Sequence, residues 1–192
     1  MQQHAPQPGH NSPQSWLKTY YFSRAAFALA WIGAVLAFAR SAPAVAAVLM
    51  VAYPAWDAIA NLVDASRSGG MARNQPQAVN ALVSVVTALA VAIALPDMHL
   101  VLGVFGAWAI LAGVLQLGAG LRRWKSAGAQ WAMVLSGAQS ALAGGFFIVQ
   151  AGQPAMPAVT GLVGYAGFGA FYFLVSALWL SVAATRRARK AT

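Results

Sequence analysis

The chain has 192 residues, of which 60% are hydrophobic and only 8% charged, and its formal net charge is +9. Soluble domains have about 25% charged residues, so the three acidic residues of this chain cannot solubilise a surface of its size. The composition therefore predicts an integral membrane protein. The basic residues lie in short gaps between apolar runs, whereas a nucleic-acid interface needs a basic stripe on a polar domain. No nucleic acid is expected as a partner.

Residue types that hold metals and cofactors are scarce. The chain has no cysteine, which excludes disulfides, thiolate metal sites and iron–sulfur clusters. The three histidines lack metal-ligand spacing, since His4 and His10 lie in a polar tail and His99 starts an apolar run. No Ser-His-Asp arrangement is expected, because His99 falls towards the outer face and Asp57 and Asp64 towards the inner one. We expect no metal, no cofactor and no enzymatic activity.

In chain order, residues 1–15 are rich in Gln, Pro and His without hydrophobic periodicity, which predicts a disordered cytoplasmic tail. Six apolar runs follow, each near the roughly 20 residues that a bilayer core requires, and the first is interpreted as an uncleaved anchor. The runs cover about 22–39, 44–64, 78–95, 99–120, 130–150 and 160–184. Backbone polar groups in lipid need internal partners, so all six runs are predicted to be helices. The prediction is an all-α, polytopic membrane protein with a transmembrane domain over 16–186 and a basic tail over 187–192.

The basic residues predict how the chain crosses the membrane. Eleven of them are expected on one side, against Arg40 alone on the other. The eleven are Lys18, Arg24, Arg67, Arg73, Arg122, Arg123, Lys125, Arg186, Arg187, Arg189 and Lys190. The positive-inside rule places that side, with both termini, in the cytoplasm, where anionic lipid headgroups are the expected partners. Trp16, Tyr20 and Tyr21, ahead of the first run, are interpreted as interfacial anchors.

Three segments of the chain resemble one another. They are "PAWDAIANLVD" (54–64), "GAWAILAGVLQ" (106–116) and "GAFYFLVSALW" (169–179). Pro43, Pro96 and Pro154 recur at comparable intervals and are expected to mark the turns after the first, third and fifth runs, because proline stops a helix. We interpret the chain as three repeated helical hairpins, over about 22–64, 78–120 and 130–184. Parallel repeats favour pseudo-threefold packing about the membrane normal, and an open arrangement is the alternative.

A family resemblance rests on two adjoining segments. "GAWAILAGVLQLGAGLRRWK" (106–125), followed by "WAMVLSGAQSALAGGFFI" (131–148), resembles the HdeD-type acid-resistance membrane proteins, which are built from a short repeat of unknown function. The resemblance extends over nearly all of 18–186. It implies a six-helix protein of the bacterial inner membrane, linked in at least one family member to survival of acid stress. It carries over no catalytic or binding residues, and the acids in the second run depart from the family pattern.

Small residues recur on one face of the fourth run and of the fifth. The fourth run has Gly106, Ala109, Gly113, Gln116 and Gly120 on one stripe, and the fifth has Ser136, Gly137, Ser140, Gly144 and Gly145. Small residues let helices approach closely in lipid, so Gly106, Gly113, Gly120, Gly137 and Gly144 are expected to pack the two helices together. A hinge or a substrate passage is the alternative.

Asp57 is the leading candidate for a functional residue inside the membrane. An acid at bilayer depth costs about 2.5–3.5 kcal/mol on insertion scales and therefore usually finds a partner. One interpretation is a proton-responsive carboxylate or cation site. The other is a structural acid satisfied by Asn80, Ser84, Arg24 or a tyrosine hydroxyl. Asp64, near the membrane boundary, is expected to be a solvated interfacial charge.

Amide side chains complete the candidate polar site. Asn61, Asn80, Gln116 and Gln139 are expected to form hydrogen bonds between helices. The stripes that correspond to the one in the fourth run are Pro54, Asp57, Asn61, Asp64 and Ser68 in the second, and Gly169, Tyr172, Ser176, Trp179 and Ala183 in the sixth. If the repeats pack around an axis, all three stripes face inward.

Three functions remain open at this point. The resemblance favours a non-enzymatic protein of the bacterial inner membrane that helps the envelope tolerate acid or other stress. A small transporter or channel with a polar site around Asp57 is the alternative, and it predicts a water-accessible cavity. A scaffold for a membrane partner is the third, and a homo-oligomer is compatible with each of them.

Overall fold

The computed structural model describes residues 13–122, 124 and 130–191. Long helices make up most of this part of the chain, which contains no strand. They are α1 (Pro13–Phe38), α2 (Pro43–Arg67), α3 (Gln75–Ala94), α4 (Met98–Arg122), α5 (Gln130–Ala151) and α6 (Val163–Ala191), with a short 3₁₀ helix, η1 (Val159–Leu162), before α6. For the described residues, the all-α prediction is confirmed.

Each of the six long helices can cross a membrane by its length and its composition. The shortest, α3, has 20 residues, and a helix of that length spans about 30 Å, the thickness of a hydrocarbon core. Large apolar side chains lie on the outside of the bundle, where Ile93 is 81% and Leu142 is 77% exposed. Lipid accommodates such a surface, so the chain is a multi-pass membrane protein, as its composition predicts.

Two helices are longer than the apolar runs. α1 begins at Pro13, because polar residues ahead of the first run continue the same helix. α6 continues to Ala191 through the basic segment that was expected to be a separate tail, and Ala, Arg and Lys are strong helix formers. Residues 1–12 of the expected tail lie outside the described residues, as do Arg123 and Lys125.

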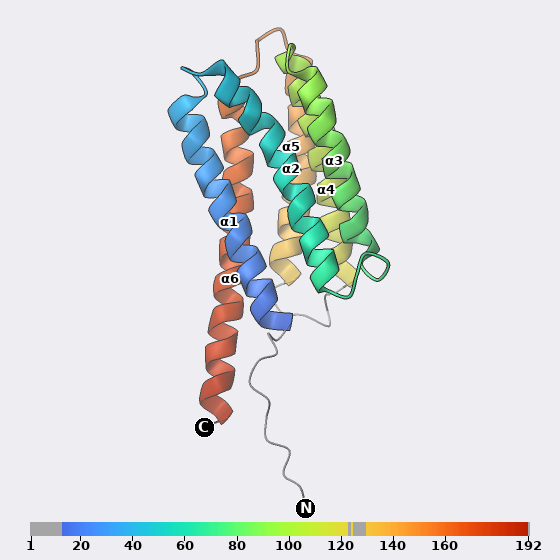
Figure 1. Cartoon of the computed structure of the whole chain (residues 1–192), viewed down its shortest axis with the longest axis vertical. Helices are drawn as coiled ribbons and strands as arrows, with labels where there is room; N and C mark the ends of the chain where they lie inside the picture. Colours follow the sequence, from blue (N-terminus) through green and yellow to red (C-terminus); the bar gives the residue numbers. More distant parts are fainter. Residues whose placement is uncertain (1–12, 123, 125–129, 192) are drawn as a thin grey trace, which may run out of the picture.

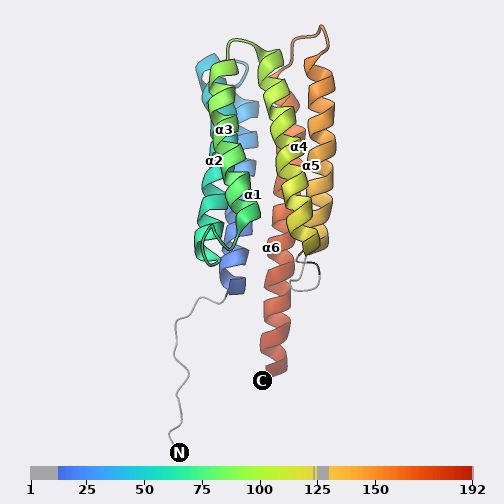
Figure 2. The same cartoon turned by 90° about the vertical axis from the view of Figure 1, so that its right-hand side faces the viewer.

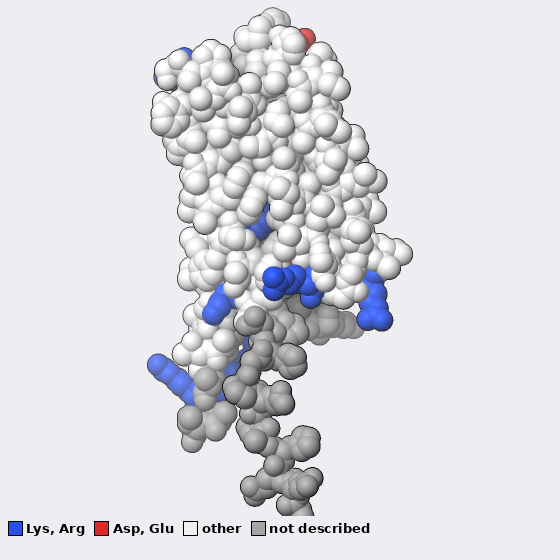
Figure 3. All heavy atoms as spheres, viewed as in Figure 1, with Lys and Arg blue, Asp and Glu red and all other residues white. Residues whose placement is uncertain are grey.

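The helices form a ring in chain order. Each helix from α1 to α5 contacts the next one, and α6 contacts α1, an arrangement that can be followed in Figures 1 and 2. The start of α1 and the end of α6 lie at the same end of the ring. Figure 3 shows most of the visible Lys and Arg side chains at this end, which we call the basic end. The turns from α1 to α2 and from α3 to α4 lie at the opposite end.

Contacts around the ring are unequal. The most extensive ones join α4 to α5, α2 to α3 and α1 to α6, whereas α1 touches α2, and α5 touches α6, only sparsely. None of the three most extensive pairs is one of the expected hairpins. The ring therefore consists of two parts, the pair α1/α6 and the group α2–α5, which meet along two seams.

Glycines bring α4 and α5 into backbone contact. A Cβ added at Gly113 would lie 2.6 Å from the carbonyl oxygen of Gly137, and one at Gly144 would lie 2.5 Å from the carbonyl oxygen of Gly106. The contact is looser at Gly120, where an added Cβ would first meet a side chain at 3.0 Å. The five glycines assigned to helix packing from the sequence all lie at this contact.

An apolar core fills the half of the ring away from the basic end. Its most deeply buried members include Val35 of α1, Val91 of α3 and Phe105 of α4, which are at most 1% exposed. Phe147 of α5 and Leu162 of η1 belong to the same cluster. The interior of the ring is closed at that end by packed side chains.

Candidate functional site

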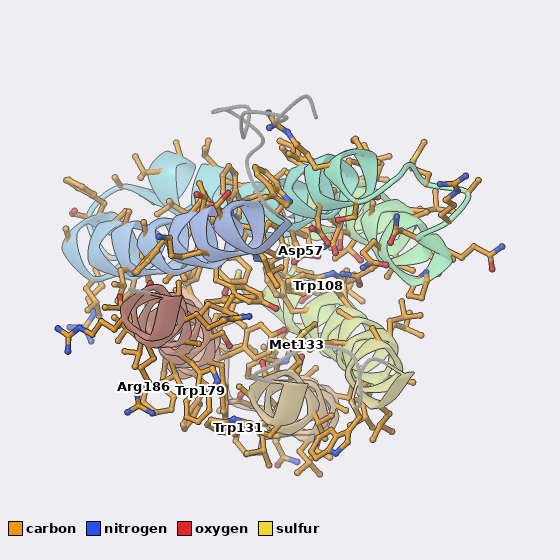
Figure 4. The ribbon with its side chains drawn as sticks, turned by 90° about the horizontal axis from the view of Figure 1, so that it is seen from below. Asp57, Trp108, Trp131, Met133, Trp179 and Arg186 are labelled. Atoms are coloured by element: carbon orange, nitrogen blue, oxygen red, sulfur yellow. The ribbon has the colours of Figure 1, made fainter. Side chains whose placement is uncertain are left out.

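The other half of the ring encloses a cavity of about 120 Å³, and all six long helices contribute to its wall. Its polar lining includes Tyr20, Tyr21, Arg24, Tyr53, Asp57, Asn61, Asp64, Gln77, Asn80, Gln116, Ser136, Gln139, Ser140, Tyr165 and Tyr172. The lining reaches Pro76, in the first turn of α3 at the basic end. Seen from that end, Asp57, Trp108 and Met133 lie towards the space between the helices (Figure 4). A cavity of this size holds about four water molecules at roughly 30 Å³ each.

A buried ion pair lies in the cavity wall. Asp57 is 5% exposed, and its Oδ1 accepts a hydrogen bond from Nη2 of Arg24. Nη1 of Arg24 donates to the hydroxyl of Tyr20 at 3.0 Å, and the guanidinium carbon lies 4.5 Å from the centre of the Phe173 ring, which gives a cation–π contact. The pair joins α1 to α2 across one of the two seams.

The second oxygen of Asp57 collects hydrogen bonds from α2 and α3. Its Oδ2 accepts from Nδ2 of Asn61 at 3.0 Å, from Nδ2 of Asn80 at 3.2 Å and from Oγ of Ser84 at 2.7 Å. The Oγ of Ser84 accepts in turn from Nε1 of Trp108 at 2.9 Å. A continuous hydrogen-bonded chain thus runs from α4 through α3 to the ion pair, and the carboxylate of Asp57 has a donor on each oxygen.

The partners of Asp57 are those of the structural interpretation, because Arg24, Asn80 and Ser84 all contact it. The orientation prediction counts Arg24 with the basic residues outside the membrane, as a charge ahead of the first helix, and this position is wrong. α1 begins at Pro13, so Arg24 lies inside the ring, where its side chain is only 14% exposed. Arg24 lies at the edge of an apolar run, where a basic residue can belong either to the preceding loop or to the helix. Its pairing with Asp57 on α2 decides between the two, and the sequence does not show that pairing.

Asp64 is buried, whereas a solvated interfacial charge was expected. It is 5% exposed and lines the cavity. Its Oδ1 accepts from Nε1 of Trp16 at 3.3 Å and from Oγ of Ser68 at 3.4 Å, both long hydrogen bonds. Tyr20 and Tyr21, expected as interfacial anchors, are 9% and 4% exposed and line the same cavity. The early start of α1 explains all three differences, because its first turns cover the end of α2.

The amides that the sequence singled out have different roles. Nδ2 of Asn61 donates to the carbonyl oxygen of Asp57 at 2.8 Å as well as to its carboxylate, so it bonds within α2 rather than between helices. Nε2 of Gln116 donates to the carbonyl oxygen of Met133 at 3.4 Å and links α4 to α5. Gln139 lines the cavity wall.

Several cavity residues were not expected from the sequence to belong to the polar site. Oγ of Ser140 donates to the carbonyl oxygen of Ala109 at 2.9 Å and lies 3.0 Å from the hydroxyl of Tyr165, which joins α5 to α6 across the second seam. Gln77, in the first turn of α3, is 9% exposed and also lines the cavity. A glutamine at the start of a helix is common at a solvated helix end, so no local signal distinguishes it.

The three aligned stripes do not all face inward. The stripe in α2 lines the cavity through Asp57, Asn61 and Asp64, but the stripe in α4 packs against α5 and reaches the cavity only at Gln116. The two halves of the stripe in α6 have different surroundings. Its first half lines the cavity, whereas Trp179 is 53% exposed and contacts Trp131 outside the ring, with ring centres 6.4 Å apart (Figure 4). Close packing of α4 on α5 rotates the small-residue face of α4 away from the axis.

The chain matches no protein-family model, no curated protein and no solved structure. The site is therefore interpreted from its own geometry. Within the described part of the chain, no three His, Cys, Asp or Glu side chains come together as metal ligands. The cavity combines a compensated ion pair, hydrogen-bonding side chains and aromatic rings in a space that is closed at one end, which suits reversible binding of a small polar molecule.

Proposed function

We propose that this protein is a small-solute transporter of the bacterial inner membrane, non-enzymatic, which binds its solute in the central cavity. The observation that carries the proposal is the wall of that cavity, to which all six long helices contribute polar or aromatic residues. A site near the middle of the bundle, with hydrogen-bonding groups at membrane depth, is typical of transporters. Polar groups at membrane depth cost free energy unless they are partnered. A polar ligand in the cavity would partner many of these side chains at once.

The cavity favours a carrier over an open channel. The apolar core blocks the half of the ring away from the basic end, so solute can enter from one end only. Passage through the ring then requires a rearrangement of the helices. The pair α1/α6 can move relative to the group α2–α5 at the two seams, where the contacts are sparse. Each seam is crossed by specific polar contacts, Arg24 to Asp57 at one and Ser140 to Tyr165 at the other, which hold the present state.

Water access to the cavity tests this proposal, and the chain has no cysteine of its own to interfere. Ser136 lines the cavity, whereas Ser176 is 3% exposed and does not line it. In vesicles with the basic end outward, we expect Ser136→Cys to react with a charged methanethiosulfonate reagent and Ser176→Cys to stay unmodified. Equal protection of both thiols would show that the cavity is dry and would overturn the proposal.

We also infer that the basic end, with both chain termini, faces the cytoplasm, because basic loops are retained on that side. Met71, between α2 and α3, is 53% exposed, and Met156, between α5 and η1, is 72% exposed. A membrane-impermeant maleimide added to spheroplasts is expected to label Met156→Cys and to spare Met71→Cys, with the reverse pattern in inverted vesicles. Labelling of Met71→Cys in intact spheroplasts would reverse the orientation.

A second candidate function is a role in acid or envelope stress. It is favoured by the resemblance of residues 106–125 and 131–148 to HdeD-type proteins. Deletion of the gene is expected to lower survival after acid challenge, and the wild-type gene is expected to restore it. Survival that is unchanged by the deletion at every cell density would count against this role without affecting the solute-binding proposal.

A further inference from the structure

The charges around the cavity do not cancel. Arg24 and Asp57 compensate each other as a buried pair. Asp64 is equally buried, at 5% exposure, yet among the described residues no basic side chain lies within 4.0 Å of its carboxylate. The nearby guanidinium of Arg67 lies instead over the ring of Trp16, 4.8 Å from its centre, and Arg67 itself is exposed to solvent. Among the charged side chains that the structure describes, Asp64 is therefore the cavity carboxylate without an ion-pair partner.

The same wall presents hydrogen-bond acceptors without donors. Oε1 of Gln77 and Oδ1 of Asn80 are buried side-chain oxygens that have no hydrogen-bond partner among the described residues, and both residues belong to the cavity lining. The orientation of the Asn80 amide is set by its other atom, because Nδ2 donates to Asp57. An unpaired buried acceptor costs about 1–3 kcal/mol, so a ligand that donates to these oxygens recovers that cost.

We propose that the cavity binds a small organic ammonium ion, with Asp64 as its counter-ion and the side-chain oxygen of Gln77 as a hydrogen-bond acceptor. Asp64 lies in the last turn of α2 and Gln77 in the first turn of α3, and these helices pack closely. Both residues therefore lie at the mouth of the cavity. Asn80 lies one helical turn deeper than Gln77 and accepts a further donor from the ligand. This inference rests on the proposed function and names its substrate class.

The chemistry of an ammonium ion fits this wall better than the alternatives. An ammonium head has three N–H donors and no acceptor, and it meets a carboxylate and amide oxygens that lack donors. An anion would meet the uncompensated charge of Asp64, and Arg24 is already occupied by Asp57. A metal ion such as Ca²⁺ takes six to eight oxygens, and the described residues provide no cluster of three acidic or histidine ligands.

Size and lining set a limit on the ligand. Engineered cavities of roughly 150 Å³ bind benzene, so a cavity of about 120 Å³ admits an alkylammonium ion of a few non-hydrogen atoms. Tyr20, Tyr21 and Tyr172 contribute aromatic rings to the wall, and aromatic faces attract cations. The short alkyl group of such an ion finds apolar surface on Ala112 and Leu115.

Equilibrium binding of radiolabelled methylammonium to the full-length protein in lipid nanodiscs tests the inference. We expect saturable binding that formate and formamide do not compete for and that sodium displaces at least about tenfold less well. Asp64→Asn is expected to weaken binding about tenfold or more, because a hydrogen bond to a charged group is lost. Asp64→Glu keeps the charge and is expected to retain binding.

Two further variants test the site even if Asp64→Asn fails to fold. Gln77→Leu removes the acceptor at similar volume and is expected to weaken methylammonium binding several-fold. Asp97→Asn is the matched control, because Asp97 is exposed and accepts from the backbone N–H of His99 at 2.8 Å at the opposite end of the ring. Its binding is expected to equal that of the wild type. Thermal unfolding of each variant in detergent identifies those that are misfolded.

The outcomes separate this inference from the proposed function. Binding of formate or formamide in place of methylammonium would overturn the ammonium class and leave a solute-binding cavity. Sodium that competes as well as methylammonium would also overturn it, in favour of a simple cation site. Wild-type affinity in both folded Asp64→Asn and folded Gln77→Leu would remove these residues from the site. Absence of binding by all the probes, together with an unreactive Ser136→Cys, would overturn both proposals.

Discussion

Gly144 and Gly145 are neighbours on α5 with opposite surroundings, which makes them a sharp test of the packing between α4 and α5. A Cβ at Gly144 would lie 2.5 Å from the carbonyl oxygen of Gly106 and 2.8 Å from the backbone nitrogen of Ile110. A Cβ at Gly145 would meet nothing within 4 Å. Gly144→Ala must therefore push two helix backbones apart, and Gly145→Ala places a methyl group in open space.

The magnitude follows from the distances. Backbone atoms cannot rotate away as a side chain can, so the helices must separate by about 1 Å to reach van der Waals contact, and overpacking of this kind costs roughly 1–3 kcal/mol. Both substitutions share the gain in helix propensity, about 1 kcal/mol from glycine to alanine. Their difference isolates the packing cost, so Gly144→Ala is expected to be about 1–3 kcal/mol less stable than Gly145→Ala.

Reversible unfolding by sodium dodecyl sulfate in mixed micelles, followed by tryptophan fluorescence, measures the free energy of unfolding of both variants. The wild type gives the reference, and Gly118→Ala is a second control, because an added Cβ there also meets nothing within 4 Å. Stabilities of Gly144→Ala and Gly145→Ala that agree within about 0.5 kcal/mol, the ordinary range of surface substitutions, would refute the backbone contact between α4 and α5.

Two further predictions concern the buried polar chain. Arg24→Met leaves Asp57 buried without a counter-charge and is expected to lower the free energy of unfolding by about 3–5 kcal/mol. Arg40 is exposed, so Arg40→Met is the control and is expected to change that free energy by less than about 0.5 kcal/mol. Similar unfolding midpoints of the two variants in the same titration would contradict a stabilising ion pair between Arg24 and Asp57. In a double-mutant cycle, Trp108→Phe and Ser84→Ala are expected to couple by about 1 kcal/mol through their hydrogen bond. Additive effects of the two substitutions would show that the bond contributes nothing.

Much of the architecture could be predicted from local patterns. A membrane helix must satisfy its backbone internally and expose apolar side chains to lipid, so the six apolar runs are visible in the sequence and correspond to α1–α6. The small-residue stripes of α4 and α5 are visible for a similar reason, because only glycine permits a carbonyl oxygen of one helix within about 3 Å of the Cβ position of another. Helix ends were less well predicted, since residues 13–21 contain no apolar run and nevertheless form the first turns of α1.

The polar site depended on tertiary structure. Asp57 was recognised as an intramembrane acid from its position alone, but its pairing with Arg24 joins residues on different helices. Asp64 was expected to be solvated and is buried. A residue near a helix end is solvated or buried according to what packs on it, and α1 covers Asp64. Hydropathy and spacing are properties of one segment, whereas the burial and pairing of a charge depend on its neighbours in space. The carboxylate of Asp57 is therefore paired with Arg24, whereas Asp64 has hydrogen-bond donors but no ion-pair partner among the described residues.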